Sequence, residues 1–241
     1  MEMILYTIAV THLTIICVTL YLHRCQCHRS IHISPVLSHL MRFWLWLTTG
    51  MVTKEWVAIH RKHHQTTDQI GDPHSPKTLG ILTVLLTGAS LYAKAAADRK
   101  LVDNYGSGSP DDWIEEHVYS CYQTLGLLLM LIIDMNLFGA WGLLIWGIQM
   151  IWIPLWAAGV VNGIGHYYGY RNTDTKDHSK NIFPIGILIG GEELHNNHHH
   201  SPAYYKFSEK YWEFDIGYMY IRLGELVGLI KRIEYPNKYV S

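Results

Sequence analysis

Charged side chains are scarce in this sequence: they make up 16% of its 241 residues, against about 25% in a typical soluble domain. Glu2 is the only Asp, Glu, Lys or Arg before Arg24, so the basic start of a cleavable signal peptide is not found. The formal net charge of −1 offers no general attraction to nucleic acid. The length indicates one domain, residues 1–241, rather than two independent ones.

Sequence motifs for bound electron carriers are absent as well. Cys25 and Cys27 form a C-x-C, which lacks the C-x-x-C spacing of common zinc and redox sites, so we expect the four cysteines to be reduced and structural. No haem-attachment motif, iron–sulfur spacing or G-x-G-x-x-G fingerprint occurs. Redox chemistry in this chain would therefore need electrons from a separate protein.

Three long apolar runs predict membrane spans. Residues 3–22, 119–136 and 137–161 approach or exceed the length of about 20 residues that crosses about 30 Å of hydrocarbon. The sequence Leu-Phe-Gly-Ala at 137–140 indicates a tight turn between the last two runs. The prediction is an all-α integral membrane protein with about three transmembrane helices.

Two further apolar runs are predicted to be amphipathic helices that lie at the membrane surface. Residues 36–52 carry His39 and Arg42 near the middle of the run. An unpaired Arg at the bilayer centre costs at least about 2.5 kcal/mol, so we place this helix in the interface. Residues 79–97 are similar and are followed by the polar run Asp-Arg-Lys.

Many of the 16 histidines gather in three clusters. The clusters are the H-x-x-x-x-H of His23 and His28, and two H-x-x-H-H motifs, His60, His63, His64 and His195, His198, His199. On a helix, residues at i, i+3 and i+4 share one face, so each H-x-x-H-H presents three imidazoles toward one point. A lone histidine such as His12 is better read as a core or interfacial residue. Repetition of the spacing indicates a metal site.

The number of donors indicates two metal ions. His166, at i+4 from Asn162 near the end of the last predicted span, brings the total to about nine nitrogen donors. Structural zinc takes about four ligands and catalytic zinc about three. Imidazoles without thiolate suit iron, copper or zinc. Dioxygen activation at two non-haem irons fits best, although the count alone does not exclude two zinc ions.

His23 and His28 need a separate explanation because they are five residues apart. On a regular helix they would diverge by about 140°. The spacing therefore suits either ligands to two different metals or a helix end that is not regular.

The predicted topology places all three clusters on one side of the membrane. One span precedes the first cluster, and a two-span hairpin precedes the last, so residues 23–118 and 162–241 form a cytoplasmic and interfacial helical cap. The basic residues fall on the same side, whereas the hairpin tip and the N-terminal end have no Lys or Arg. By the positive-inside rule the histidines face the cytoplasm.

These residues resemble the integral-membrane fatty acid desaturases, most closely the acyl-CoA Δ9 (stearoyl-CoA) branch and its bacterial relatives. That family carries H-R-x-x-x-H, H-R-x-H-H and H-N-x-H-H boxes, which stand here at 23–28, 60–64 and 195–199. Further family-like segments are Glu55-Trp56, residues 72–75, residues 162–172 and residues 191–194. The resemblance covers about residues 20–220.

The resemblance implies a set of site residues. The implied iron ligands are His23, His28, His60, His63, His64, His166, His195, His198 and His199, with Asn162 reaching one iron through a water. Trp56 matches an aromatic residue that lines the bend of the acyl tunnel. Two departures are plain: one span instead of two precedes the first box, and Gly50 and Ala158 replace the polar residues that accompany this Trp. The resemblance therefore does not fix the chain length or the double-bond position.

Each charged residue near the histidine boxes has two possible roles. Asp68, Asp72, Glu192 and Glu193 are candidate hydrogen-bond partners that orient the histidines, or else solvated surface charges. Arg171, with Lys176 and Lys180, is a candidate contact for a phosphate-bearing headgroup of the substrate. Basic residues beside a membrane also commonly face anionic lipid.

The implied activity is desaturation of a long-chain acyl group, at Δ9, with O₂, two Fe²⁺ ions and two external electrons. The implied partners are acyl-CoA or acyl-phospholipid and a separate ferredoxin-like or reductase donor, in a bacterial inner membrane. A hydroxylase of the same di-iron type is an alternative, because oxygen rebound would give an alcohol. A non-catalytic metal-binding membrane protein is a more distant one.

Overall fold

The computed structural model describes residues 1–234; the last part of the predicted cap, residues 235–241, lies outside the described residues. Helix α1 (Glu2–Cys17) continues directly into a π-helix, η1 (Val18–Cys27). Helix α8 (Trp141–Ile153) continues through the π-helix η3 (Pro154–Val161), and a 3₁₀ turn, η4 (Ile164–His166), follows. These two stretches, Glu2–Cys27 and Trp141–His166, are long and apolar enough to cross a membrane.

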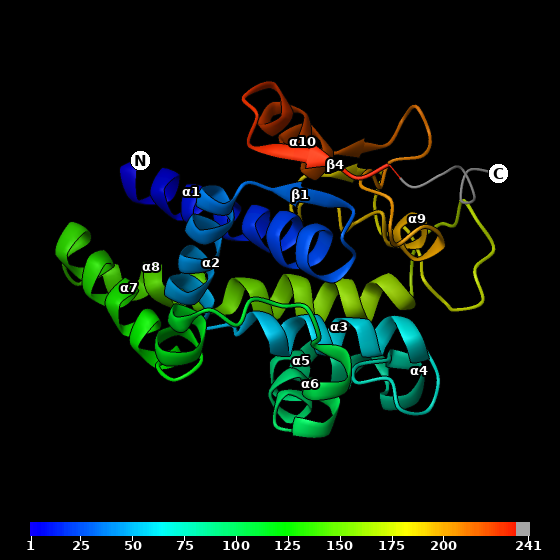
Figure 1. Ribbon diagram of the computed structural model, residues 1–241, viewed down its shortest axis with the longest axis horizontal. Helices are drawn as coiled ribbons and strands as arrows, with labels where there is room; N and C mark the ends of the chain where they lie inside the picture. Colours follow the sequence, from blue (N-terminus) through cyan, green and yellow to red (C-terminus); the bar gives the residue numbers. More distant parts are fainter. Residues whose placement is uncertain (235–241) are drawn as a thin grey trace.

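Helix α7 (Gln123–Phe138) packs against α8 as the predicted hairpin (Figure 1). The chain turns at Gly139, whose φ of 58° favours glycine, and at Ala140, so the predicted turn is confirmed. The helix begins at 123 rather than 119, because residues 115–119 form a separate π-helix, η2 (Glu115–Tyr119). With 16 residues, α7 is shorter than the usual span of about 20.

The two predicted surface helices are present as α2 (Pro35–Thr49) and α5 (Ile81–Ala96). Arg42 in α2 is buried but not unpaired: its guanidinium lies 2.6 Å from Asp112 and 3.3 Å from Glu115. The cost assumed for an unpaired charge therefore does not apply to α2. Its 15 residues are nevertheless too few for an ordinary span.

Three further helices surround α5 at the base of the molecule in Figure 1. They are α3 (Thr53–Thr66), α4 (Pro76–Leu79) and α6 (Arg99–Tyr105), and α6 is bent by 83° from α5. Helix α3 carries the second histidine cluster and packs against η1, which carries the first. The two clusters are thus brought together by direct helix packing.

The C-terminal part adds two short helices and two small sheets to the predicted all-helical fold. The helices are α9 (His195–His200) and α10 (Ile216–Leu226). Strand β2 (Ile185–Gly186) pairs in parallel with β3 (Phe214–Asp215), and β4 (Ile230–Arg232) pairs antiparallel with β1 (Ile31–Ile33). The β1–β4 pair ties the end of the described chain to the segment that follows η1 (Figure 1).

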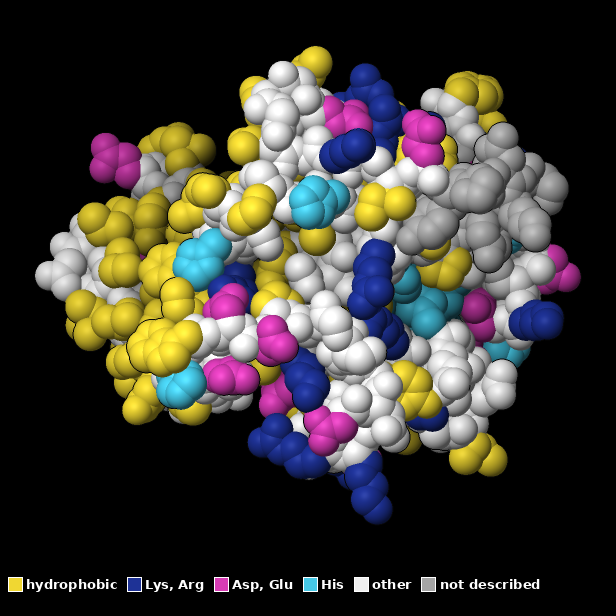
Figure 2. All heavy atoms as spheres, in the orientation of Figure 1, with side chains coloured by type: hydrophobic (Ala, Val, Ile, Leu, Met, Phe, Trp, Pro, Cys, Tyr) yellow, Lys and Arg dark blue, Asp and Glu magenta, His cyan; other side chains and the backbone are white. Residues whose placement is uncertain are grey.

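Exposed apolar side chains gather at one end of the molecule. Figure 2 shows them over the side where α7 and the start of α1 lie, whereas charged and histidine side chains lie over the rest of that face. Examples are Ile4, Leu5, Leu137, Trp141 and Leu143, each more than half exposed. An apolar surface of this kind suits contact with lipid.

A fully buried arginine stabilises the part of the fold that carries the histidine clusters. Arg24 donates to both carboxylate oxygens of Asp215 at 3.0 Å, and its guanidinium lies 3.7 Å from the ring centroid of Phe207. It also donates to Thr19 and to the carbonyl oxygen of Tyr205. Arg24 therefore joins η1 to the C-terminal part.

We expect Arg24→Met to destabilise the protein strongly, by about 3–5 kcal/mol, because it leaves the buried Asp215 carboxylate without its partner. Thermal unfolding in detergent checks this. The control is Arg222→Met, which removes a half-exposed ion pair with Glu225 and should cost at most about 1 kcal/mol. Equal losses of Tm in the two variants would contradict the role given to Arg24.

Candidate metal centre

Five histidines from three parts of the chain form a first cluster. They are His23, His28, His60, His64 and His198, and one ring nitrogen of each lies within 4.8 Å of the others. The Nε2 atom of His198 is 3.0 Å from that of His23 and 3.0 Å from that of His64. Helices η1, α3 and α9 therefore converge on one point, and we call this group the first cluster.

Four buried histidines form a second cluster: His63, His166, His195 and His199. The Nε2 atoms of His166 and His195 are 2.9 Å apart. The Nε2 atoms of His63 and His199 are buried and have no hydrogen-bond partner among the described residues. The two clusters together bring into one place all nine histidines that the sequence singled out.

Four carboxylates orient these histidines from behind. Asp72 faces Nδ1 of His63, Asp68 faces Nδ1 of His166 and Asp177 faces Nδ1 of His199, each at 3.0 Å, and Glu192 faces Nδ1 of His23 at 2.7 Å. Such contacts fix the ring orientation of metal-ligating histidines and raise their basicity. Three of the four acids support the second cluster.

Asp72 and Glu192 are ionised, and six of the clustered imidazoles are neutral. Burial favours a higher pKa for Asp72, but hydrogen bonding to His63 outweighs it and holds the pKa below its usual value; the pKa of Glu192 is lowered in the same way, by His23. Burial and then neighbouring imidazoles push the pKa of six clustered imidazoles well below the usual value; these are His28, His60, His64, His195, His198 and His199. Where Nδ1–H donates to a carboxylate, Nε2 presents a bare lone pair to its cluster.

This arrangement fits metal ions. Lone pairs that face one another at about 3 Å repel unless a proton or a cation lies between them, and the lowered pKa values disfavour the proton. The donors are imidazoles with no thiolate, a set that suits iron, copper or zinc. The first cluster could hold one ion and the second cluster another.

The π-helix explains how His23 and His28 reach the same cluster. The backbone N–H of His28 donates to the carbonyl oxygen of His23 at 3.0 Å, an i to i+5 bond. Residues five apart come close to one full turn in a π-helix, unlike in an α-helix. Of the two explanations for their spacing, the irregular helix end is the one found.

Polar residues between the histidines anchor the helices that carry them. Arg61 of α3 donates to the carbonyl oxygens of Gln26 and Cys27, which satisfies the end of η1. The side chain of Asn181 accepts hydrogen bonds from the backbone N–H groups of Asn196 and Asn197, at the start of α9. The short α9 is therefore fixed from outside rather than by its own length.

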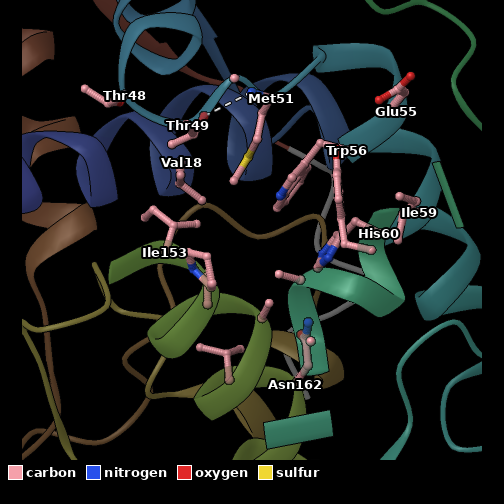
Figure 3. Close-up of a pocket in the computed structure, with 18 of the residues that line it drawn as sticks. Val18, Thr48, Thr49, Met51, Glu55, Trp56, Ile59, His60, Ile153 and Asn162 are labelled. Carbon is pink, nitrogen blue, oxygen red and sulfur yellow. Dashed lines mark hydrogen bonds between the residues drawn. The ribbon is translucent and has the colours of Figure 1, made fainter. Parts of the chain in front are cut away.

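A cavity of about 520 Å³ adjoins both clusters (Figure 3). His23, His60 and His195 line one part of it, and apolar residues from η1, α7, α8 and η3 line most of the rest. Trp56 also lines the cavity and stacks on His60, with ring centroids 4.8 Å apart. Figure 3 shows Trp56 and His60 on α3 facing the side that carries Ile153 and Asn162.

Three residues expected from the resemblance also border this cavity: Asn162, Gly50 and Ala158. Two expected residues take other positions. Arg171 does not line the cavity; it donates to Thr175 and lies 3.4 Å from Asp174. Glu193 accepts hydrogen bonds from the backbone N–H groups of Ile189 and Gly191 and makes no hydrogen bond with a clustered histidine among the described residues.

Two residues at the site were not singled out from the sequence. Asp177 lies in a loop 22 residues before its partner His199, so no helical spacing links them. His74 is buried, lines the cavity, and has an Nε2 atom with no hydrogen bond among the described residues. Burial lowers its pKa to about 3, so His74 is neutral. Its position two residues after Asp72, within the family-like segment 72–75, was the available signal.

Comparisons with known proteins agree with this geometry. The family model for fatty acid desaturases matches residues 3–215. A probable chloroplastic lipid desaturase, ADS3.2, of Arabidopsis thaliana is 32% identical over 92% of this chain and 61% of its own length. The sn-1 stearoyl-lipid 9-desaturase of Synechocystis is 30% identical over 91% of this chain and 67% of its own length.

A third relative has a different kind of substrate in its name. The acyl-CoA 5-desaturase AL21 of Anemone leveillei is 28% identical over 91% of this chain and 68% of its own length. The chain thus spans about two thirds of the length of these relatives. The match to the family model covers most of the sequence, including every clustered histidine. This chain belongs to the fatty acid desaturase family.

Proposed function

We propose that this protein is a membrane-bound di-iron desaturase that introduces a double bond, at Δ9, into a long-chain acyl group. The observation that carries the proposal is the direct contact between the two histidine clusters and a mainly apolar cavity. A saturated chain offers no acidic or basic group at its reacting carbons, so the protein must act by positioning. The relatives named as stearoyl-lipid 9-desaturases support this position of the double bond.

The overall reaction consumes one O₂, two electrons and two protons, and converts one CH₂–CH₂ unit to CH=CH with release of two waters. The nine clustered histidines would hold two iron ions, and the ions supply the O₂-derived oxidant. The protein's own residues bind the chain beside His23 and His60, and the apolar lining excludes bulk water. The electrons come from a separate ferredoxin-like or reductase protein.

The substrate is an acyl-phospholipid or acyl-CoA, reached from the membrane surface. We place the site at the cytoplasmic face of a bacterial inner membrane. The support is that both apolar spans end at the histidine clusters, and that most basic residues lie on the same side of the predicted topology.

Asp72→Asn should weaken metal binding in the second cluster by about 10–100-fold, because the amide no longer fixes His63 as the carboxylate does. The measurement is metal retained per chain after dialysis against a graded chelator, by elemental analysis. Asp174→Asn is the control, since its side chain is fully exposed and touches no clustered histidine. Equal retention in parent and Asp72→Asn would contradict the metal assignment.

Expression of the protein in a host without its own desaturase should produce new unsaturated acyl chains. His64→Ala should abolish them, because it removes a donor of the first cluster, whereas His32→Ala, on an exposed residue of β1, should not. Mass spectrometry of the cellular lipids gives both results. Unchanged product in His64→Ala would refute the site, and an alcohol without an alkene would identify a hydroxylase.

A further inference from the structure

The mainly apolar wall of the cavity carries a few polar side chains. Gln149 of α8, Thr48 of α2 and Gln123 of α7 are among them. Gln149 is 4% exposed, and its amide approaches the buried carboxyl group of Asp134 but makes no hydrogen bond of ordinary geometry with the described residues. A buried amide with so little hydrogen bonding is unusual, because buried polar groups are nearly always hydrogen-bonded.

A buried carboxyl group lies beside Gln149. Asp134 of α7 is fully buried, and Tyr6 of α1 donates to one of its oxygens at 2.7 Å. The other oxygen has no hydrogen bond among the described residues. Ionisable groups within membrane helices are costly and commonly serve function. Gln149 lines the cavity, and Asp134 and Tyr6 lie behind it and do not line the cavity.

The cavity extends from the metal centre to Gln149. Gln149 lies on α8, and Ala158 and Asn162 lie later on the same nearly continuous helical stretch and line the same cavity. A chain that is bound beside His23 and His60 and fills the cavity therefore brings its methyl end toward Gln149.

We propose that Gln149 sets the upper limit of acyl-chain length, an inference that rests on the proposed function. A chain that stops short of Gln149 leaves the amide accessible to water at the end of the cavity. A longer chain places its methyl group against the amide and displaces that water, so the amide loses its hydrogen bonds and gains none. The protein then discriminates against the longer chain in two ways: the Gln149 amide is desolvated, and the cavity has no room for further carbons.

The test compares Gln149→Leu and Gln149→Met with the parent. Each strain receives an equal mixture of myristic, palmitic, stearic and arachidic acids, and mass spectrometry measures the desaturated fraction of each chain. Both variants should raise the ratio of longer to shorter products by at least about tenfold, equivalent to about 1.4 kcal/mol. Asn136→Leu is the matched control, because it removes an exposed amide from α7 away from the cavity.

The stability of the variants separates this role from a structural one. Removal of an unpaired buried amide should leave the Tm of both variants equal to or above that of the parent. An unchanged product ratio in active, stable variants would overturn the inference while leaving the proposed function intact. A parent that makes no unsaturated product would instead overturn the proposed function itself.

Discussion

The structure depends on the inward orientation of nine imidazole lone pairs. The imidazoles direct their Nε2 atoms toward each other at about 3 Å, as His166 and His195 do, and Asp68 faces Nδ1 of His166. This arrangement is unfavourable without cations and favourable with them. The carboxylates behind the second cluster place negative charge close to the ion that it would hold. Metal ions bound at the two clusters would therefore stabilise the fold.

Other parts of the fold position the histidines so that their ring nitrogens meet. The π-helix η1 turns His23 and His28 toward one point, and Arg61 satisfies the carbonyl groups at its end. Arg24 of η1 pairs with Asp215 in the C-terminal part of the chain, which also supplies α9. The arginines next to the histidines in the first two motifs are thus structural partners of the site, since both bind protein groups rather than the cavity.

The two H-x-x-H-H motifs could be predicted as ligand groups from the sequence, because residues at i, i+3 and i+4 lie on one face of a helix within about one turn. The hairpin and its turn at Gly139 were also predictable from apolar length. Asp177 was not, since a loop residue is placed by tertiary hydrogen bonds, here with Ser179 and Thr175. The pairing of Arg42 with Glu115 was missed for the same reason. Contacts between distant segments leave no periodic signal.

The most direct test of the account is anomalous X-ray diffraction from crystals of protein prepared with iron. The account predicts two iron peaks, one among the five Nε2-facing histidines of the first cluster and one among the four histidines of the second. A single peak, or peaks that lie outside both clusters, would contradict it.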